Sequence, residues 1–217
     1  PEIAEAIARL FAPGYEAAVT AEWIPALGEI HERVQRGAQV AEVGCGTGQA
    51  LIPVALAYPN SRFTGFDVDP GSVAKARTRA AEGGLEDRLA FELVAAEHIA
   101  GTDHFDLIMA FNCIHDMVDP RGALSAIRRA LRPDGVFLWA EADASDRLED
   151  NINPLGRLLY ATSCMHCMTV SLAHGGEGLG NVVGVSTARE LAKDAGFGQF
   201  ERLPVTHSYF QLFALRR

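Results

Sequence analysis

The chain lacks an excess of basic residues and a long apolar run, and each absence excludes a class of protein. Its 19 Lys and Arg residues stand against 28 Asp and Glu residues, a formal net charge of −9, and such a surface repels phosphate backbones and anionic lipids. No apolar run approaches the roughly 18 residues that span a bilayer, and no charged-then-apolar leader opens the sequence. We therefore expect a cytoplasmic protein that binds neither nucleic acid nor membrane.

Cysteine is also scarce. Four residues in a chain of 217 are too few and too unevenly spaced for a disulfide scaffold. We expect all four thiols to be reduced. Zinc-binding residue types do gather at Cys164, His166, Cys167 and His174. The C-x-x-C pair has no second well-spaced pair, however, and lies in an apolar helical run. We favour buried packing for both cysteines and predict no metal site.

What the sequence does contain is a regular alternation of strand and helix patterns. With 48% hydrophobic and 22% charged residues, it is typical of one globular domain with a real core. From residue 38 onward, β-branched or aromatic runs alternate with helical patterns, which predicts a parallel sheet with helices on both faces. The predicted strands are Gln39–Val43, Arg62–Asp67, Leu89–Val94, Phe105–Phe111 and Val136–Ala142.

Helix boundaries are marked by caps and turns. Asp69-Pro70 and Asp119-Pro120 each place an N-cap acceptor before a proline, and Asp116 is a second capping candidate at Pro120. The helix after Pro120 is predicted to end before the turn Pro133-Asp134-Gly135. A capping box at Thr187–Glu190 predicts a further helix that ends near Gly196.

Three segments lie outside the alternation. Residues 1–37 are predicted to be helical and to cover an edge or the mouth of the sheet. Residues 143–181 contain an apolar helical stretch and a glycine-rich loop, and we expect them to form a lid-like insertion in a domain of residues 38–217. Phe200–Val205 and Ser208–Leu215, separated by two residues, predict a closing antiparallel pair. The apolar positions of the first segment are Ile3, Ile7, Leu10, Trp23, Leu27, Ile30 and Val34.

A glycine-rich loop is the most informative stretch. It follows the first predicted strand and opens a helix, which is where a doubly wound sheet binds its ligand. Gly44, Gly46 and Gly48 form G-x-G-x-G, whereas dinucleotide folds use G-x-G-x-x-G. Glu42 precedes the loop and would oppose a pyrophosphate, and no Gly-Lys-Ser/Thr follows to make a phosphate loop. The pattern disfavours NAD and nucleotide-sugar enzymes and favours a ligand that carries a cationic group.

Residues 42–48, Glu-Val-Gly-Cys-Gly-Thr-Gly, are similar to the first motif of class I S-adenosylmethionine-dependent methyltransferases, E/D-x-G-x-G-x-G. The resemblance covers residues 38–142 and extends to the closing helix and hairpin. It implies a Rossmann-like α/β fold with a doubly wound, mostly parallel sheet of about seven strands. The sheet would end in a C-terminal antiparallel hairpin and carry helices on both faces. The cofactor would be S-adenosylmethionine (SAM), and the product S-adenosylhomocysteine.

The resemblance also implies which residues bind the cofactor. Asp67 would accept both ribose hydroxyls, although it could equally be an ordinary turn carboxylate, and Val68 would lie along the adenine. Many family members carry an aspartate after the third strand that accepts from the adenine amino group. Here Glu97, or the backbone around Ala96, would have to serve instead. The whole predicted set is Glu42, Gly44, Cys45, Gly46, Gly48, Asp67, Val68, Ala96, Glu97 and Asn112.

The acceptor would lie against residues 112–117, which follow the fourth strand. Enzymes that methylate amino groups of DNA and RNA show [N/D/S]-P-P-[Y/F] there, and this chain does not. A small-molecule acceptor is therefore expected. His115 is the candidate base, because imidazole titrates near neutrality, with Asp116 or Asp119 as its orienting partner. Alternatively, His115 packs over the cofactor or caps the next helix.

Within the family, residues 113–117 and 141–157 and the Gly-Leu-Gly loop are similar to a bacterial group of methyltransferases. Members of that group usually carry an N-terminal winged-helix-like domain, which this chain does not contain. A SAM sensor that binds the cofactor without turnover is therefore the alternative function. The oligomeric state is open, with a homodimer as one candidate.

Overall fold

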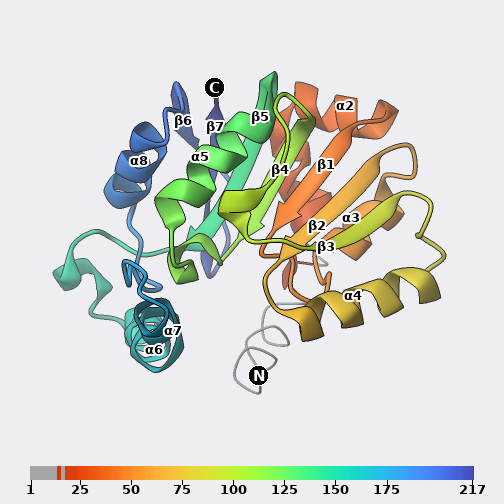
Figure 1. Cartoon of the computed structure of the whole chain (residues 1–217). Helices are drawn as coiled ribbons and strands as arrows, with labels where there is room; N and C mark the ends of the chain where they lie inside the picture. Colours follow the sequence, from red (N-terminus) through yellow and green to blue (C-terminus); the bar gives the residue numbers. More distant parts are fainter. Residues whose placement is uncertain (1–13, 16–17) are drawn as a thin grey trace.

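A seven-stranded sheet forms the centre of the computed structural model, which describes residues 14–15 and 18–217. The strand order is β3-β2-β1-β4-β5-β7-β6 (Figure 1). The first five strands pair in parallel, and β7 runs antiparallel to β5 and β6, which confirms the predicted mixed sheet. The bounds are β1 Gln39–Val43, β2 Arg62–Asp67, β3 Leu89–Leu93, β4 Phe105–Phe111, β5 Leu131–Ala142, β6 Gln199–Arg202 and β7 Phe210–Arg216.

Helices cover both faces of the sheet. One face packs against η1 and α2 to α4, the other against α5 and α8. β4 is buried at every position, as expected for a central parallel strand covered on both sides. The helical elements are η1 Val19–Trp23, η2 Pro25–Leu27, α2 Glu29–Arg36, α3 Leu51–Ala57, α4 Pro70–Glu82, η3 Ala96–His98, η4 Ile114–Asp116, α5 Pro120–Ala130, η5 Leu148–Asn151, α6 Pro154–Thr162, η6 Ser163–Cys167, α7 Met168–Ala173 and α8 Val185–Asp194.

The segment before β1 buries its predicted apolar face. Trp23, Leu27, Ile30 and Val34 are all buried in one core cluster. The predicted positions Ile3, Ile7 and Leu10 lie outside the described residues. No helix within residues 14–15 and 18–217 has the length and apolar character needed to cross a membrane.

Two of the predicted caps are confirmed. Asp69 accepts a hydrogen bond from the Ser72 backbone N–H at 2.7 Å, and Asp119 accepts one from the Gly122 N–H at 2.8 Å. Asp116 caps no helix. The strand β5 begins at Leu131, so the turn predicted to precede it lies inside the strand, where the register against β4 shifts.

Two C-terminal predictions are wrong. The helix α8 begins at Val185 without a capping box, because the distant Asp146 accepts from the Ser186 N–H at 2.9 Å and the Thr187 N–H at 3.0 Å. The hairpin connection spans residues 203–209 rather than two residues. Pro204 has no N–H for a ladder. His207 Nδ1 accepts from the N–H groups of Tyr209 and of Phe210, the first residue of β7.

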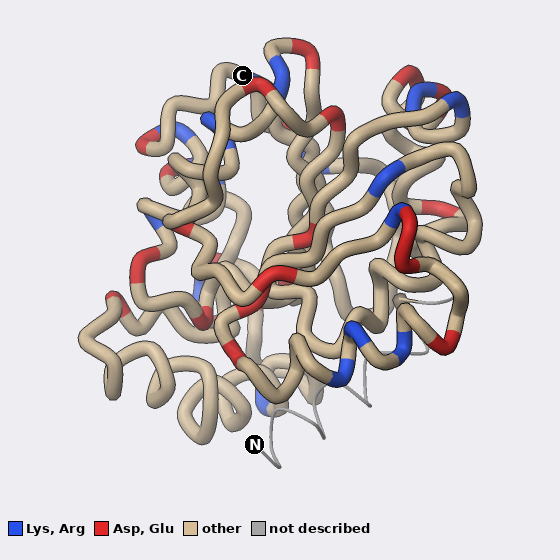
Figure 2. Tube along the Cα trace, turned by 45° about the vertical axis from the view of Figure 1, so that its right-hand side comes forward, with Lys and Arg blue, Asp and Glu red and all other residues tan. Residues whose placement is uncertain are grey.

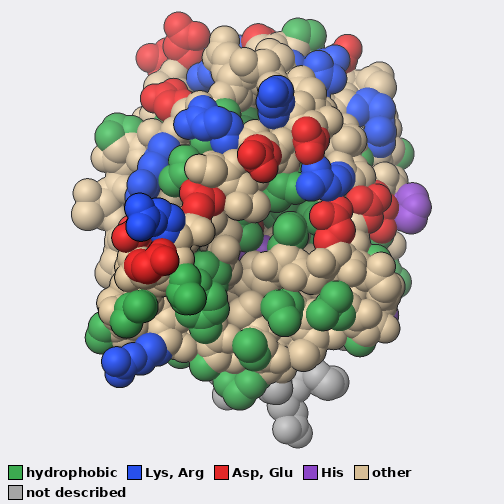
Figure 3. All heavy atoms as spheres, turned by 90° about the vertical axis from the view of Figure 1, so that its left-hand side faces the viewer, with side chains coloured by type: hydrophobic (Ala, Val, Ile, Leu, Met, Phe, Trp, Pro, Cys, Tyr) green, Lys and Arg blue, Asp and Glu red, His purple; other side chains and the backbone are tan. Residues whose placement is uncertain are grey.

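Residues 143–181, which we call the insertion, join β5 to α8. In Figure 1 its helices α6 and α7 lie together below the sheet. Figure 3 shows hydrophobic side chains on the lower part of the molecule's left-hand face. The insertion's exposed large hydrophobic residues are Leu148, Ile152, Leu158, Met165, Val170 and Leu172.

We predict that Asp146→Ala lowers the free energy of unfolding by about 1 kcal/mol, the usual loss when an N-cap acceptor is removed. Urea unfolding followed by circular dichroism measures the change. Glu149→Ala is the matched control, because the carboxylate of this exposed neighbour forms an ion pair with Arg147 of the same segment, at 3.7 Å, and lies outside the α8 cap. Equal unfolding midpoints for the two variants would show that Asp146 does not stabilise α8.

Candidate active site

The site lies where the strand order reverses. β1 and β4 are neighbours in the sheet, and the chain leaves them in opposite directions across it, toward β2 and toward β5. In open α/β sheets, ligands bind outside the carboxyl ends of the strands at such a point. The strands β1, β2 and β4 end at this edge, at Val43, Asp67 and Phe111, and the loops that follow them begin there.

Left-handed backbone shapes the glycine loop after β1. The φ angles of Gly44, Gly46 and Gly48 are +67°, +52° and +75°, which favours glycine at each. A Cβ on Gly44 would lie 2.7 Å from Cys113 Sγ, and one on Gly48 2.8 Å from Phe91, so packing also requires those glycines. A Cβ on Gly46 would meet nothing within 4 Å. Gly46 therefore faces open space where a ligand can approach the backbone.

Asp67 joins the ends of β1 and β2. Its Oδ2 accepts from the Gly46 N–H and its Oδ1 from the Asp69 N–H, both at 2.8 Å. Each oxygen keeps a further lone pair, so the fixed carboxylate can still accept from a vicinal diol. Val68 beside it is 68% exposed, which suits an apolar surface for an adenine ring.

Glu42 is a buried carboxyl group with an unsatisfied atom. It is 4% exposed, and its Oε2 has no hydrogen-bond partner among the described residues. Burial and then the charge of Asp67 raise the pKa of Glu42 well above its usual value, against an opposing backbone hydrogen bond from Leu51. A cationic ligand group would supply the missing partner and favour the ionised form.

The remaining predicted cofactor residues lie along the same edge. Cys45 is buried, and burial raises the pKa of its thiol. The Val94 N–H donates to the Asp67 carbonyl at 3.0 Å, which holds the chain that enters η3, with Ala96 and Glu97, beside Asp67. Asn112 has a φ of +54°, and its buried Oδ1 has no partner among the described residues.

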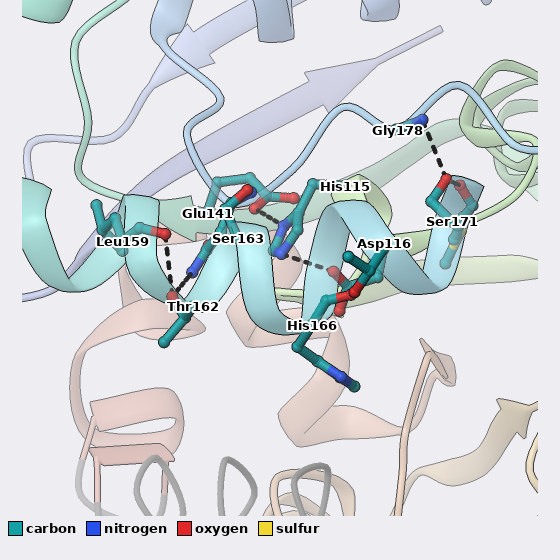
Figure 4. Close-up of polar contacts among 12 residues, drawn as sticks. His115, Asp116, Glu141, Leu159, Thr162, Ser163, His166, Ser171 and Gly178 are labelled. Atoms are coloured by element: carbon teal, nitrogen blue, oxygen red, sulfur yellow. Dashed lines mark hydrogen bonds and ion pairs between the residues drawn. The ribbon is translucent and has the colours of Figure 1, made fainter. Parts of the chain in front are cut away.

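His115 lies in η4 and is fully buried. Its Nδ1 lies 2.6 Å from Glu141 Oε2 (Figure 4). The indole N–H of Trp139 donates to Glu141 Oε1 at 2.8 Å. Burial alone would lower the pKa of His115, but Glu141 and Asp116 outweigh it and raise that pKa well above its usual value. The ring is therefore oriented by a fixed carboxylate through Nδ1.

Of the two expected partners of His115, only Asp116 reaches it. Asp116 Oδ1 lies 3.2 Å from His115 Nε2 (Figure 4), an ion-pair distance at an angle outside hydrogen-bond geometry. Burial would raise the pKa of Asp116, but His115 outweighs it and lowers that pKa. Glu141 is not among the site residues predicted from the sequence. Its signal was its position at the carboxyl end of β5, on the edge that also carries Asp67.

The insertion contacts this part of the site. Cys167 is buried and lies beside His115 and Asp116, whereas Cys164 is exposed, so the prediction that both cysteines are buried is wrong for Cys164. The Ser171 hydroxyl donates to the Met117 carbonyl at 3.0 Å and accepts from the Gly178 N–H at 3.1 Å (Figure 4). These bonds fasten α7 to the loop that carries His115.

In Figure 2, Lys and Arg are scattered among Asp and Glu over the part of the chain that the structure describes. Several basic side chains instead serve internal contacts. Arg33 and Arg132 bind the buried Asp106 at 3.1 and 2.7 Å, and Arg79 donates to the Thr47 carbonyl at 2.7 Å.

Comparison with known proteins gives consistent matches. A family model described as "Methyltransferase domain" matches residues 35–201. The chain is 32% identical over 125 residues to methyltransferase GfsG of Streptomyces halstedii, a match that spans 56% of this chain and 45% of that protein.

Solved structures show the same fold. An O-methyltransferase family protein of Burkholderia thailandensis superposes with a TM-score of 0.72 at 20% identity, covering 98% of this chain and 57% of that one. Human N-acetylserotonin methyltransferase, solved in complex with SAM, gives 0.65 at 20% identity, with 91% and 51% covered. The chain thus spans about half the length of the proteins it matches.

We predict that Gly46→Val weakens SAM binding at least about 100-fold, because the side chain would fill the open approach to the loop backbone. Isothermal titration calorimetry measures the affinity. Gly84→Val is the matched control, since Gly84 also has a positive φ and open space around its Cβ position, but lies between α4 and β3. Equal binding by both variants would mean that the loop is only a turn.

We also predict that SAM affinity depends on pH through Glu42. Below the raised pKa the carboxyl is protonated, and a cationic ligand must displace that proton. Affinity therefore rises with pH, by up to about tenfold per pH unit, until the raised pKa of the free chain is passed. Titrations across pH measure the slope. Glu42→Gln should abolish it, and Glu92→Gln, an exposed change on β3, should not. A slope that persists in Glu42→Gln would assign it to another group.

Proposed function

Because the chain belongs to the methyltransferase-domain family whose model matches residues 35–201, we propose that it transfers a methyl group from SAM to a small-molecule acceptor and releases S-adenosylhomocysteine. The class I resemblance seen in the sequence agrees with that family and with the seven-stranded sheet. The arrangement of Asp67 carries the proposal. Its carboxylate is held between the Gly46 and Asp69 N–H groups, beside the open face of Gly46.

The cofactor half of the site would distribute SAM along the crevice. Asp67 would accept the ribose hydroxyls, and the exposed Val68 would pack on the adenine. The unpartnered oxygens of Glu42 and Asn112 would face the positively charged methionine end. This cofactor would thus supply partners for the unpartnered oxygens and cover the exposed apolar side chain.

The acceptor half of the site would be the loop after β4. The reaction is an in-line displacement, in which a lone pair of the acceptor forms the new bond to carbon and the sulfonium sulfur keeps the electrons of the old one. Alignment supplies most of the rate. His115 is the group that we assign to the acceptor. Glu141 occupies its Nδ1, so Nε2 is the atom through which it acts.

The net charge of −9 and the scattered basic residues favour a small molecule over a nucleic acid as acceptor. The test is a transfer assay with methyl-labelled SAM and fractionated bacterial metabolites, read by mass spectrometry of the labelled products. A labelled small molecule is the expected result. SAM binding without transfer to any fraction would instead favour the sensor.

In the same assay, we predict that His115→Gln retains SAM binding but lowers turnover by at least about 100-fold. The glutamine amide can still donate to Glu141, which limits the cost of leaving that carboxylate buried. Retained SAM affinity in calorimetry shows that the variant folds. His98→Gln, a change to an exposed histidine of η3, is the control. Unchanged turnover in His115→Gln would remove His115 from the acceptor site.

A further inference from the structure

Three potential metal ligands meet where the insertion touches the loop after β4. His115 and Asp116 come from η4, and Cys167 comes from η6. One ring nitrogen, one carboxylate oxygen and the thiol sulfur all lie within 4.8 Å of one another. The cluster combines residues that are some fifty positions apart, so it was not visible as a spacing motif in the sequence.

Two buried atoms of this cluster have no hydrogen bond. His115 Nε2 and Asp116 Oδ1 have almost no exposed surface, and their contact within the described residues is the ion pair that they make with each other. A buried polar atom without a hydrogen bond is costly, since it has lost its water without a full replacement. Because the two atoms lie 3.2 Å apart, one bound ion could satisfy both.

The surroundings of His115 match those of a metal-bound imidazole. Such a histidine usually gives its second ring N–H to a carboxylate, which fixes the tautomer and the ring orientation. Here Glu141 accepts at Nδ1, and the indole of Trp139 holds Glu141 in turn. Nε2 is thereby aimed at Asp116, while the ring of His166 points away from the cluster in Figure 4.

Charge favours a cation at the same place. The carboxylates of Glu141 and Asp116 lie 2.6 and 3.2 Å from the two nitrogens of one imidazole. Even a protonated His115 leaves the group with one excess negative charge, shared between the buried Glu141 and Asp116, whose side chain is 31% exposed. A divalent cation would neutralise that charge.

We propose that His115 Nε2, an oxygen of Asp116 and Sγ of Cys167 bind one divalent ion of the zinc type. Nitrogen, oxygen and thiolate ligands together suit zinc, which is tetrahedral with ligand bonds of about 2.0–2.3 Å. Those bonds place ligand atoms about 3.3–3.8 Å apart, close to the 3.2 Å separation of Nε2 and Oδ1. Three protein ligands leave the fourth position open, as in catalytic zinc sites.

This site deepens the proposed function and rests on it for its chemistry. An acceptor hydroxyl or thiol at the fourth position would ionise more readily, because the cation lowers its pKa. Its proton would leave to solvent as it binds, and the oxygen or sulfur lone pair would then attack the methyl. The acceptor class is therefore an alcohol, phenol or thiol. His115 serves as a ligand in this scheme, not as the base expected from the sequence.

The experiment measures zinc without an acceptor. The full chain is stripped with a chelator under reducing conditions, then titrated with zinc against a chromophoric competitor, and bound metal is counted by mass spectrometry. We expect one zinc per chain. Cys167→Ser should weaken zinc binding by more than about 100-fold, because loss of a ligand costs more than the roughly 10-fold to 100-fold that loss of a ligand's hydrogen-bond partner costs.

Cys164→Ser is the matched control, since this exposed cysteine lies on the same helical turn and should bind zinc like the unchanged chain. Cobalt in place of zinc should give a thiolate charge-transfer band that Cys167→Ser removes and Cys164→Ser keeps. Zinc binding equal in Cys167→Ser and the unchanged chain would overturn the proposal. So would the absence of zinc from the unchanged chain.

SAM calorimetry on the same stripped samples separates this proposal from the proposed function. SAM binding without zinc binding would leave the methyltransferase function standing and reduce Cys167 to packing. Zinc binding without SAM binding would support the metal site and contradict the methyltransferase function. The two proposals can therefore fail independently.

Discussion

Everything at the candidate site depends on the reversal of strand order between β1 and β4. A parallel strand needs a crossover to reach its neighbour, and diverging crossovers leave the carboxyl ends of β1, β2, β4 and β5 uncovered at one edge. Polar residues at those strand ends therefore lie at the same edge of the sheet, although they are far apart in the sequence. Asp67 ends β2 and Glu141 lies near the end of β5, so the sheet brings both residues to the same edge.

Local chemistry explains which features could be predicted from the sequence. The bounds of β1, β2 and β4, the caps at Asp69 and Asp119, and the positive φ of Gly46 each depend on a few adjacent residues. Features that depend on distant partners could not be predicted in this way. Asp146 replaces the expected capping box forty residues away, and Cys167 and Cys164 differ in burial because of what each faces across the chain.

Polar bonds hold the insertion in place, beside a small apolar cluster around Ala144 and Leu159. The Ser171 hydroxyl bridges the Met117 carbonyl and the Gly178 N–H, and Ser163 Oγ accepts from the Asn181 N–H at 3.1 Å. Glycines allow this close approach, because a Cβ on Gly176 would lie 2.7 Å from the Val118 backbone. A segment attached by a few directional bonds can separate at lower cost than a packed core element, which an acceptor entering beside the buried His115 requires.

The two halves of the site treat buried charge in the same way. Glu42 at the cofactor end and the Asp116–His115–Glu141 group at the acceptor end each keep an atom that no described residue satisfies. The fold bears this desolvation cost in the free state, since the many apolar residues of the two core clusters stabilise the sheet that holds these groups. A ligand that supplies the missing partner recovers the cost on binding, and one of the wrong charge cannot. Selectivity for a cation beside Glu42 thus follows from the burial of its carboxyl group and does not require a particular pocket shape.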